Sequence, residues 1–566
     1  MTGLGVAEQP RDPIATGPLR TFFESYYRLR PVNATFIGVH EHDHRLPDWS
    51  PEGLIAIADE SRELRDHLLT AAGPSDVAER DRQLAIAFLD VQIAELESRH
   101  FQHANPSLAL GEAIFGLISL MTRPFAPVAV RVDAAISRLN AVPRFLEDLK
   151  RTVADLPHEW RVKCLRECDG ADRLLGDGVA RWIAVEGIDG VDDPNRSGAR
   201  LVRAAQAARS AFDGVRGWLT RELPEAKPDR YACGPALFDA LLARGHWCER
   251  RRADLMTEAK DALEDALARL HERAKHAAPG GWPEVQQRLL DAHATAAEYL
   301  GTYQNIWEAC RTRSEELDLV TWPAYPIRYV SIPKHTRDAA PFLYYLFYRS
   351  PAPFDRLPTH DYAVTPVDTD MPGDEQLRRL RANNISVMKL NHVVHHGAIG
   401  HHVQNAYAYA GESEIGQIAA VDCASRIAMF QGGSMAEGWA CYATDVMDEA
   451  GFLTTDESLA QQHTRARLLA RAIVDIGLHE RSMTFGEAVA LYRDRVGMSP
   501  DAARAEACKN SMFPATAIMY WLGTSGLHAL RHERQQIEGP AFVLGRFHDR
   551  VLRFGSIPVL MLSTVW

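Results

Sequence analysis

Residues 80–98 read RDRQLAIAFLDVQIAELES, and their apolar side chains recur at intervals of three and four. At 3.6 residues per turn, Leu84, Phe88 and Val91 would lie on one face of a helix. Residues 251–273 and 283–319 show the same pattern and are rich in Ala, Leu, Glu and Arg, which favour helices. Few β-branched alternations are visible, and no repeat of fixed period occurs. The sequence therefore predicts a mainly α-helical protein.

One region differs from this helical pattern. Nine prolines lie between Trp322 and Pro372, with aromatic residues between them. Proline cannot continue the interior of a helix, so loops and short strands are expected here, and residues 327–332 are the best strand candidate. We expect this segment to form part of a site wall between a helical N-terminal region (1–320) and a metal-site region (321–566), within one continuous fold.

The composition is that of a globular protein, because hydrophobic residues make up 46% of the 566 residues and charged residues 24%. The formal net charge is −12 and basic residues are not clustered, which argues against a nucleic-acid partner. No apolar run of about 18 residues and no export signal is visible, so neither a membrane span nor secretion is expected. A cytoplasmic location is favoured, with the eight cysteines as buried reduced thiols, Cys164 and Cys168 included.

The chemistry-bearing stretch is LNHVVHHGAIGHHVQ at residues 390–404, which holds five of the 23 histidines within eleven positions. Imidazole is the commonest ligand for zinc and also suits iron, copper and nickel, so this density indicates a metal site. His392 and His396 stand four apart and could chelate together from one helix face. His395 and His401 can meet only if the helix breaks at the glycines between them, which tolerate unusual backbone angles. Both pairings remain open on this basis.

The segment HHGAIGHHVQ resembles the signature of a large bacterial family, domain-of-unknown-function family 885, whose pattern is His-Glu-x-x-Pro-Gly-His. Residues 437–442 (EGWACY) resemble a later motif of that family, Glu-Gly-Trp-Ala-x-Tyr. Further similarities at 30–48, 475–479 and 506–523 extend the resemblance over nearly the whole chain. Members are similar to zinc carboxypeptidases. The resemblance implies a large helical zincin or carboxypeptidase-like fold with a small β element before the metal-binding helix.

The resemblance also implies a ligand set of His395, His401 and Glu437 for a divalent transition metal. Zinc is expected first, with iron or manganese as alternatives. Glu437 has a second interpretation, because Ser434 precedes it by three residues, which is the spacing of a helix capping box.

The departures from the family pattern concern catalysis. The Glu that follows the first ligand in the family is His396 here, and in zincins that Glu is the general base. Lys509 likewise replaces an Arg of the family pattern. We therefore expect a repurposed active site in which His396 is the acid or base, tuned by His392. Because consecutive helical residues point about 100° apart, His396 is expected to lie outside the shell of a metal bound by His395.

Supporting roles are expected for several other residues, each with a purely structural alternative. Tyr520 could donate a hydrogen bond to a substrate oxygen. Asp475 and His479, four apart on a predicted helix, could orient a ligand histidine, as could His402. Arg328 and the pair Tyr344–Tyr345 could bind a substrate's carboxylate and apolar body. The segment HEHDH at residues 40–44 is expected to be a solvated turn rather than a site.

These features together predict a metal-dependent enzyme. The expected reaction is hydrolysis of a small molecule or a short peptide-like substrate through a metal-activated water, and not general peptidase activity. The first alternative is a metal-dependent lyase, isomerase or oxygen-using enzyme on a small metabolite. The second is a non-catalytic metal-binding protein.

Overall fold

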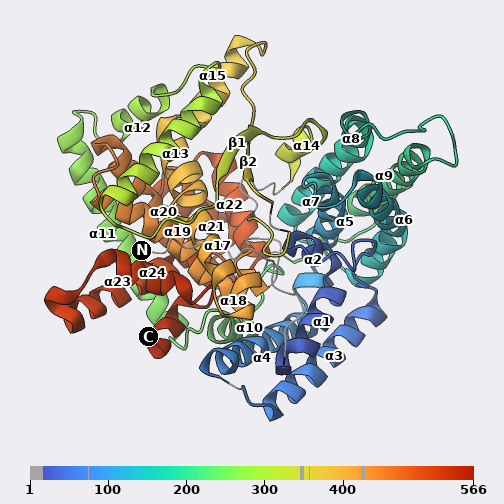
Figure 1. Ribbon diagram of the computed structural model, residues 1–566, viewed down its shortest axis with the longest axis horizontal. Coiled ribbons are helices and arrows are strands. Elements are labelled where there is room, and N and C mark those ends of the chain that lie inside the picture. The colour runs from blue at the N-terminus through green and yellow to red at the C-terminus, as the bar shows by residue number, and fades with distance from the viewer. Residues whose placement is uncertain (1–16, 74, 228, 344–349, 356, 422–426) are drawn as a thin grey trace.

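The computed structural model describes residues 17–566 except 74, 228, 344–349, 356 and 422–426. Helices dominate this part of the chain, and a single two-stranded sheet accompanies them (Figure 1). The prediction of a mainly α-helical protein is confirmed.

Most of the N-terminal helices form the body drawn in blue and cyan in Figure 1, and α10 is drawn in green beside α4. Helix α4 (Asp76–Glu97) matches the predicted helix at 80–98, and the Ser75 hydroxyl caps its start by accepting from the Ala78 amide at 3.2 Å. The other helices of this body are α1 (Arg20–Leu29), α2 (Pro31–Ile37), α3 (Pro51–Thr70), α5 (Pro106–Met121), α6 (Val128–Thr152), α7 (His158–Arg173), α8 (Val179–Glu186), α9 (Ser197–Arg221) and α10 (Pro235–Ala240).

The sheet lies in the proline-rich region, as expected. Strand β1 (Ile327–Ser331) coincides with the strand candidate and pairs in parallel with β2 (His360–Val364), with Tyr329 opposite Tyr362. Before the sheet come α11 (Arg252–Ala277), α12 (Trp282–Asp291) and α13 (Tyr299–Glu316), and after β1 comes the short α14 (Lys334–Arg337).

Helices α17 and α19 to α22 occupy the centre of the molecule, whereas α15 lies at the top of the view and α23 and α24 lie at its lower left (Figure 1). Helix α20 packs on α11, and α19 packs on α23. The helices after the sheet are α15 (Gly373–Ala382), α16 (Ile385–Val387), α17 (His401–Ala410), α18 (Glu414–Ile418), α19 (Gly433–Glu449), α20 (Thr455–Glu480), α21 (Phe485–Ala490), α22 (Pro500–Met512), α23 (Met519–Glu538), α24 (Leu544–Arg553) and α25 (Leu562–Val565).

Two large apolar cores hold these helices together, and each draws on both ends of the chain. The first joins Leu117 and Leu146 to Ile473, and the second joins Phe22 and Tyr303 to Trp439. Residues 17–320 and 321–566 thus share their buried surface, and most of the stabilising apolar burial depends on both regions.

The seven cysteines that the structure describes are free thiols, and Cys164 and Cys168 are fully buried in the first core. Cys423 lies outside the described residues. Among the described residues, no single helix is both long and apolar enough to cross a bilayer. The segments Asp76–His103 and Pro106–Met121 meet those criteria only as a pair bent by 88°.

Candidate metal centre

A helix break brings His395 and His401 together. The π-helical segment η6 (Met388–Gly397) ends just after His395, and α17 begins at His401. A side chain at residue 400 would place its Cβ 1.9 Å from the His395 carbonyl oxygen, so only glycine fits this close turn. The two imidazole rings are 4.9 Å apart between centroids and perpendicular to each other. The sequence analysis expected that His395 and His401 could meet only if the helix breaks at the glycines between them, and the backbone has this break.

Glu437 reaches the two histidines from α19. Its Oε2 lies 3.3 Å from His395 Nε2 and 3.7 Å from His401 Nε2. The glycine that follows it lets α19 approach α23 closely, because a Cβ at Gly438 would lie 2.5 Å from the Gly523 Cα. The packing of α19 on α23 therefore fixes where the carboxylate points.

The capping-box interpretation of Glu437 is wrong. Ser434 lies inside α19, which begins at Gly433, and its hydroxyl accepts a hydrogen bond from the Val559 amide at 3.1 Å. The Ser434 side chain therefore serves the C-terminal segment and leaves Glu437 directed at the histidines.

The spacing of these atoms fits a transition metal. Ligand atoms about 2.1 Å from a tetrahedral ion lie about 3.4 Å from one another. The two Glu437 distances, 3.3 and 3.7 Å, are close to that value. Ligand atoms of His395, His396 and His401 all lie within 4.8 Å of one another, so small side-chain rotations would bring them to coordinating distance.

His396 lies inside this cluster, which differs from the expectation that it would point away from the site of His395. The segment η6 is π-helical, so it turns less per residue than an α-helix and consecutive side chains diverge less. The His396 Nδ1–H donates to the Asn391 carbonyl oxygen at 2.6 Å, so Nε2 is the ring atom that carries the lone pair. That atom can serve as a base or as a further ligand.

The electrostatics keep these imidazoles neutral. Burial lowers the pKa of His395 and of His396 well below the usual value, and repulsion from neighbouring imidazoles and, for His395, from Arg471 acts in the same direction. Neutral imidazole is the form that binds metal or accepts a proton.

Cys441 is a neighbour of the centre that the sequence does not single out. It follows Glu437 by one turn of α19, and its Sγ lies 3.9 Å from His395 Nδ1. Burial and the Glu437 charge raise the pKa of this thiol, so it stays protonated. The sequence signal that could have identified Cys441 is its position four residues after Glu437. The contact orients the His395 ring so that Nε2 faces Glu437.

His392 and His402 lie beside the cluster, but their ring nitrogens form hydrogen bonds with groups outside it. His392 Nδ1 is 2.8 Å from the Tyr362 hydroxyl on β2, and His402 Nε2–H donates to the Tyr325 carbonyl oxygen at 2.8 Å. Burial lowers the pKa of each to about 4. Both histidines connect the metal-site segment to the sheet and the aromatic wall. The ligand cluster includes His396 but does not include His392.

Asp475 holds the loop that precedes α23, and His479 binds the last turn of α22. The Asp475 carboxylate accepts from the Ala515, Ala517 and Ile518 amides at 2.9–3.0 Å, and burial raises its pKa to about 7 although these donors oppose the shift. His479 Nε2–H donates to the Asn510 carbonyl oxygen at 3.0 Å. The expectation that the pair orients a ligand histidine is corrected, because Asp475 positions the loop before α23 and His479 binds the end of α22.

The expectation that Arg328 binds a substrate carboxylate is also corrected. Arg328 pairs with Asp361 on the neighbouring strand at 2.9 and 3.0 Å, and its side chain is 66% exposed. This is a solvated cross-strand ion pair and not a substrate contact. Tyr344 and Tyr345 lie outside the described residues.

Tyr520 and Lys509 line a cavity of about 350 Å³ that Glu437 also lines. Arg471 lies between these groups, with its guanidinium 2.6 Å from Glu506 and 4.9 Å from the centroid of the Tyr520 ring. Burial opposes ionisation of Glu506, but Arg471, Lys509 and Arg467 lower its pKa to about 2. The sequence pattern that identified Glu506 and Tyr520 missed Arg471, which connects them.

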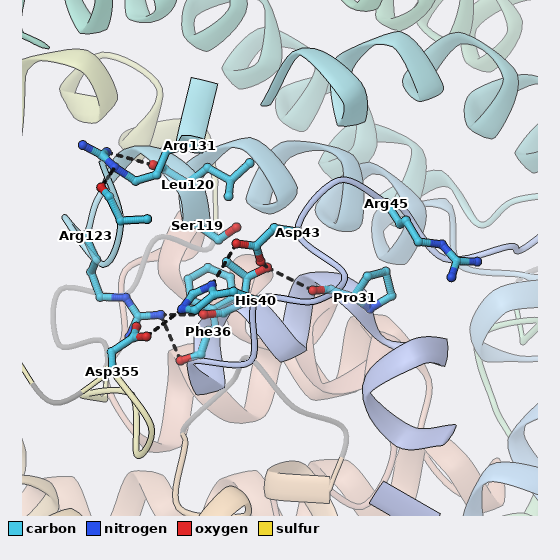
Figure 2. A network of polar contacts seen from close by, with 12 residues as sticks. Pro31, Phe36, His40, Asp43, Arg45, Ser119, Leu120, Arg123, Arg131 and Asp355 are labelled. Carbon is cyan, nitrogen blue, oxygen red and sulfur yellow. Dashed lines mark hydrogen bonds and ion pairs between the residues drawn. The ribbon is translucent and has the colours of Figure 1, made fainter. Parts of the chain in front are cut away.

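The segment at 40–44 forms a turn, but His40 is held within a polar network (Figure 2). His40 Nδ1 lies 2.8 Å from Asp43, and its Nε2 lies 2.6 Å from Asp355 of the proline-rich wall. Arg123 approaches Asp355 at 3.6 Å and donates to the carbonyls at 35 and 36. The network ties the wall to the N-terminal helices, and the expectation of a merely solvated turn is wrong for His40.

The fold and this cluster define a mainly helical protein with a candidate metal centre of histidines and one carboxylate. The family model for a bacterial protein of unknown function (DUF885) matches residues 31–565. The chain belongs to this family. The family description adds no activity, so the function is argued from the site.

Two solved structures have a similar fold. A candidate lipoprotein of unknown function from Shewanella oneidensis is 18% identical, with a TM-score of 0.75 over 97% of this chain and 100% of that chain. A candidate lipoprotein from Colwellia psychrerythraea is 17% identical, with a TM-score of 0.73 over 95% of this chain and 96% of that chain. No curated protein matches the chain. At these identities the likeness shows the fold alone.

Proposed function

We propose that the protein is a metal-dependent hydrolase of a small molecule or a short peptide-like substrate. The metal would be held by His395, His401 and Glu437. The observation that carries the proposal is that Glu437 Oε2 lies 3.3 and 3.7 Å from the two Nε2 atoms across a helix break that only glycine permits. A zinc ion at such a site supplies Lewis acidity and lowers the pKa of water.

Other residues around the metal position supply the remaining catalytic groups. His396 Nε2 takes and returns a proton, because it is the ring nitrogen that keeps a lone pair when Nδ1–H donates to Asn391. Tyr520 offers a neutral hydroxyl to a substrate oxygen. Arg471 and Lys509 supply positive charge where the reaction develops negative charge. No carboxylate follows His395, so ordinary peptides are expected to be poor substrates.

A second candidate follows from the position of His396. If it is a ligand, the set becomes three histidines and one glutamate, which suits iron or manganese as well as zinc. The protein would then be an oxygen-using enzyme, a lyase or an isomerase acting on a small metabolite.

The test is a hydrolysis panel with the purified protein. It contains casein, unrelated dipeptides and N-acyl amino acids, each assayed with and without a chelator. The proposal expects chelator-sensitive cleavage of a narrow subset and negligible cleavage of casein. Rapid turnover of unrelated peptides would show that the missing Glu matters little. A panel without any cleavage, together with bound iron or manganese, would favour the second candidate.

A cytoplasmic location remains part of the proposal. The two structural neighbours are candidate lipoproteins, which raises the alternative of a membrane-anchored protein. Fractionation of the native host decides between these alternatives, because an anchored protein would sediment with membranes.

A further inference from the structure

The cavity beside Glu437 lies between two groups of helices. Helices α1 to α5 form one side of it, and α19, α20, α22 and α23 form the other. Its volume of about 350 Å³ is within the range of sites for small organic ligands. The cavity is therefore large enough for more than the atoms that react at the metal position.

The side formed by the N-terminal helices is predominantly apolar. Its apolar lining includes Leu29, Val32, Ile57, Leu96, Leu108 and Phe115. Gly111 of α5 also lines the cavity, and a Cβ at this position would meet no atom within 4 Å. Because burial of apolar surface is favourable, this side is suited to an apolar chain.

On the other side, three basic side chains act on one carboxylate, so positive charge is in excess. The Arg471 guanidinium lies 2.6 Å from Glu506, and the charges of Lys509 and Arg467 act on the same carboxylate. Lys509, one turn after Glu506 on α22, forms no ion pair within the described part of the chain. An ammonium group in a partly desolvated cavity is unfavourable without a counter-charge, so an anion from a ligand would be stabilised here.

We propose that this cavity binds an amphipathic carboxylate, with its head group at Lys509 and a linear apolar chain of on the order of ten carbons along α1 to α5. The inference names the substrate class for the centre at Glu437 and rests on the proposed function to that extent. A substrate of this class places the bond between chain and head group beside Glu437, as an N-acyl amino acid does.

The binding test uses probes that cannot be hydrolysed. Calorimetry with the full-length protein compares dodecanoate, neutral dodecanamide and short butanoate, each below its micelle concentration. The expected order is dodecanoate first, with dodecanamide weaker by roughly tenfold because it lacks the charge. Butanoate should bind weakest, because it buries little apolar surface. Equal binding of dodecanoate and dodecanamide would overturn the head-group assignment.

Two variants place the ligand in this cavity. Gly111→Leu should fill the apolar side and weaken dodecanoate by roughly tenfold or more, the equivalent of about two displaced methylenes. Gly301→Leu is the matched control, because it lies in α13 with equally open space and lines no part of the cavity. Equal binding by the two variants would overturn the proposal.

Lys509→Met should abolish the preference for dodecanoate over dodecanamide, whereas Lys509→Arg should retain it. Lys260→Met on the exposed face of α11 is the control. A preference that survives Lys509→Met would also overturn the assignment. Thermal melting checks that each variant is folded.

Repeating the comparison with the His395→Ala, His401→Ala double variant separates this inference from the proposed function. Dodecanoate selectivity that persists in this variant shows that the cavity, and not a metal ion, binds the head group. Selectivity lost in the double variant would assign the carboxylate to the metal and overturn the Lys509 assignment. A wild-type protein that is selective for dodecanoate but contains no metal would reject the proposed hydrolase and keep the ligand class.

Discussion

His396 takes the place next to His395 where the family resemblance leads one to expect Glu. Its Nδ1–H is committed to the Asn391 carbonyl oxygen at 2.6 Å, and a ring nitrogen of His396 lies within 4.8 Å of ring nitrogens of His395 and His401. Burial lowers its pKa well below the usual value, which favours the neutral ring. The ring nitrogen that keeps its lone pair is therefore open to a proton or to a metal ion, as the proposed function requires.

The change His396→Ala should retain the metal and the fold and lower turnover by roughly 10²–10⁴, as is usual for loss of a general base. Metal content and steady-state kinetics on the best substrate of the hydrolysis panel measure both effects. His396→Gln, which keeps a polar side chain without a comparable base, should be equally slow. If His396→Ala empties the site, the residue is a ligand and the second candidate function gains support.

His40 gives a prediction on pH. Burial opposes its charge, but hydrogen bonds with Asp355 and Asp43 raise its pKa to about 9. Since the folded pKa exceeds the unfolded value of about 6.5, the stabilisation is complete below about pH 6.5 and is lost as pH rises through about 9. After allowance for the partial exposure of His40, its charged form should add about 2 kcal/mol to the free energy of unfolding at pH 6.

Melting temperatures between pH 6 and 10 test this prediction. His40→Gln should be clearly less stable than the wild type at pH 6, and the difference should shrink above pH 9. The exposed His44→Gln serves as the control for the same substitution. A His40→Gln deficit that is constant with pH would contradict the charged state of His40.

At the scale of elements, two glycine contacts determine the geometry of the centre. The turn at Gly400 brings α17 onto the end of η6, and the contact between Gly438 and Gly523 brings α19 onto α23. The carboxylate and the histidines therefore meet because backbones approach more closely than a Cβ allows.

Gly400→Ala should separate η6 from α17, since the new Cβ would lie 1.9 Å from the His395 carbonyl oxygen. We expect a loss of about 1–3 kcal/mol in the free energy of unfolding, together with loss of bound metal. Chemical denaturation and metal analysis measure the two effects. Gly301→Ala, in open space on α13, should keep both stability and metal content. A fully metal-loaded Gly400→Ala protein would show that the turn is less restrictive than its geometry indicates.

Several elements could be predicted because their signals are local. The apolar spacing of residues 84–91 identified α4, and the prolines around residues 327–332 marked β1 as a strand. The π-helical character of η6 could not be predicted, because it depends on the packing of Gly397 against the Tyr329 hydroxyl and on the following turn. That character is why His396 joins the cluster against expectation.

Contacts between distant segments could not be predicted from the sequence pattern either, because they depend on tertiary packing. Asp475 and His479 have the spacing of a local helix pair, but their partners lie 31 to 43 residues away, at the end of α22 and in the residues that lead into α23. Arg471 and Cys441 reach the site through tertiary packing, which no periodicity reports. The ligand set itself, His395, His401 and Glu437, was proposed from motif similarity, and its atoms converge in the fold.

At the scale of the whole molecule, the N-terminal helices form one wall of the cavity and the C-terminal helices carry the centre. Both apolar cores include residues from each region, so the two walls are held in fixed relation. The network at His40 adds a polar tie between the N-terminal helices and the proline-rich wall (Figure 2). The cavity between the walls is therefore preformed beside the candidate metal centre.

The metal content of the purified protein tests the central claim most directly. Elemental analysis after purification without chelators should find about one transition-metal ion per chain. The His395→Ala, His401→Ala double variant should contain almost none, whereas the surface variant His44→Ala should match the wild type. A folded wild-type protein without metal, or a double variant with full metal content, would contradict the account.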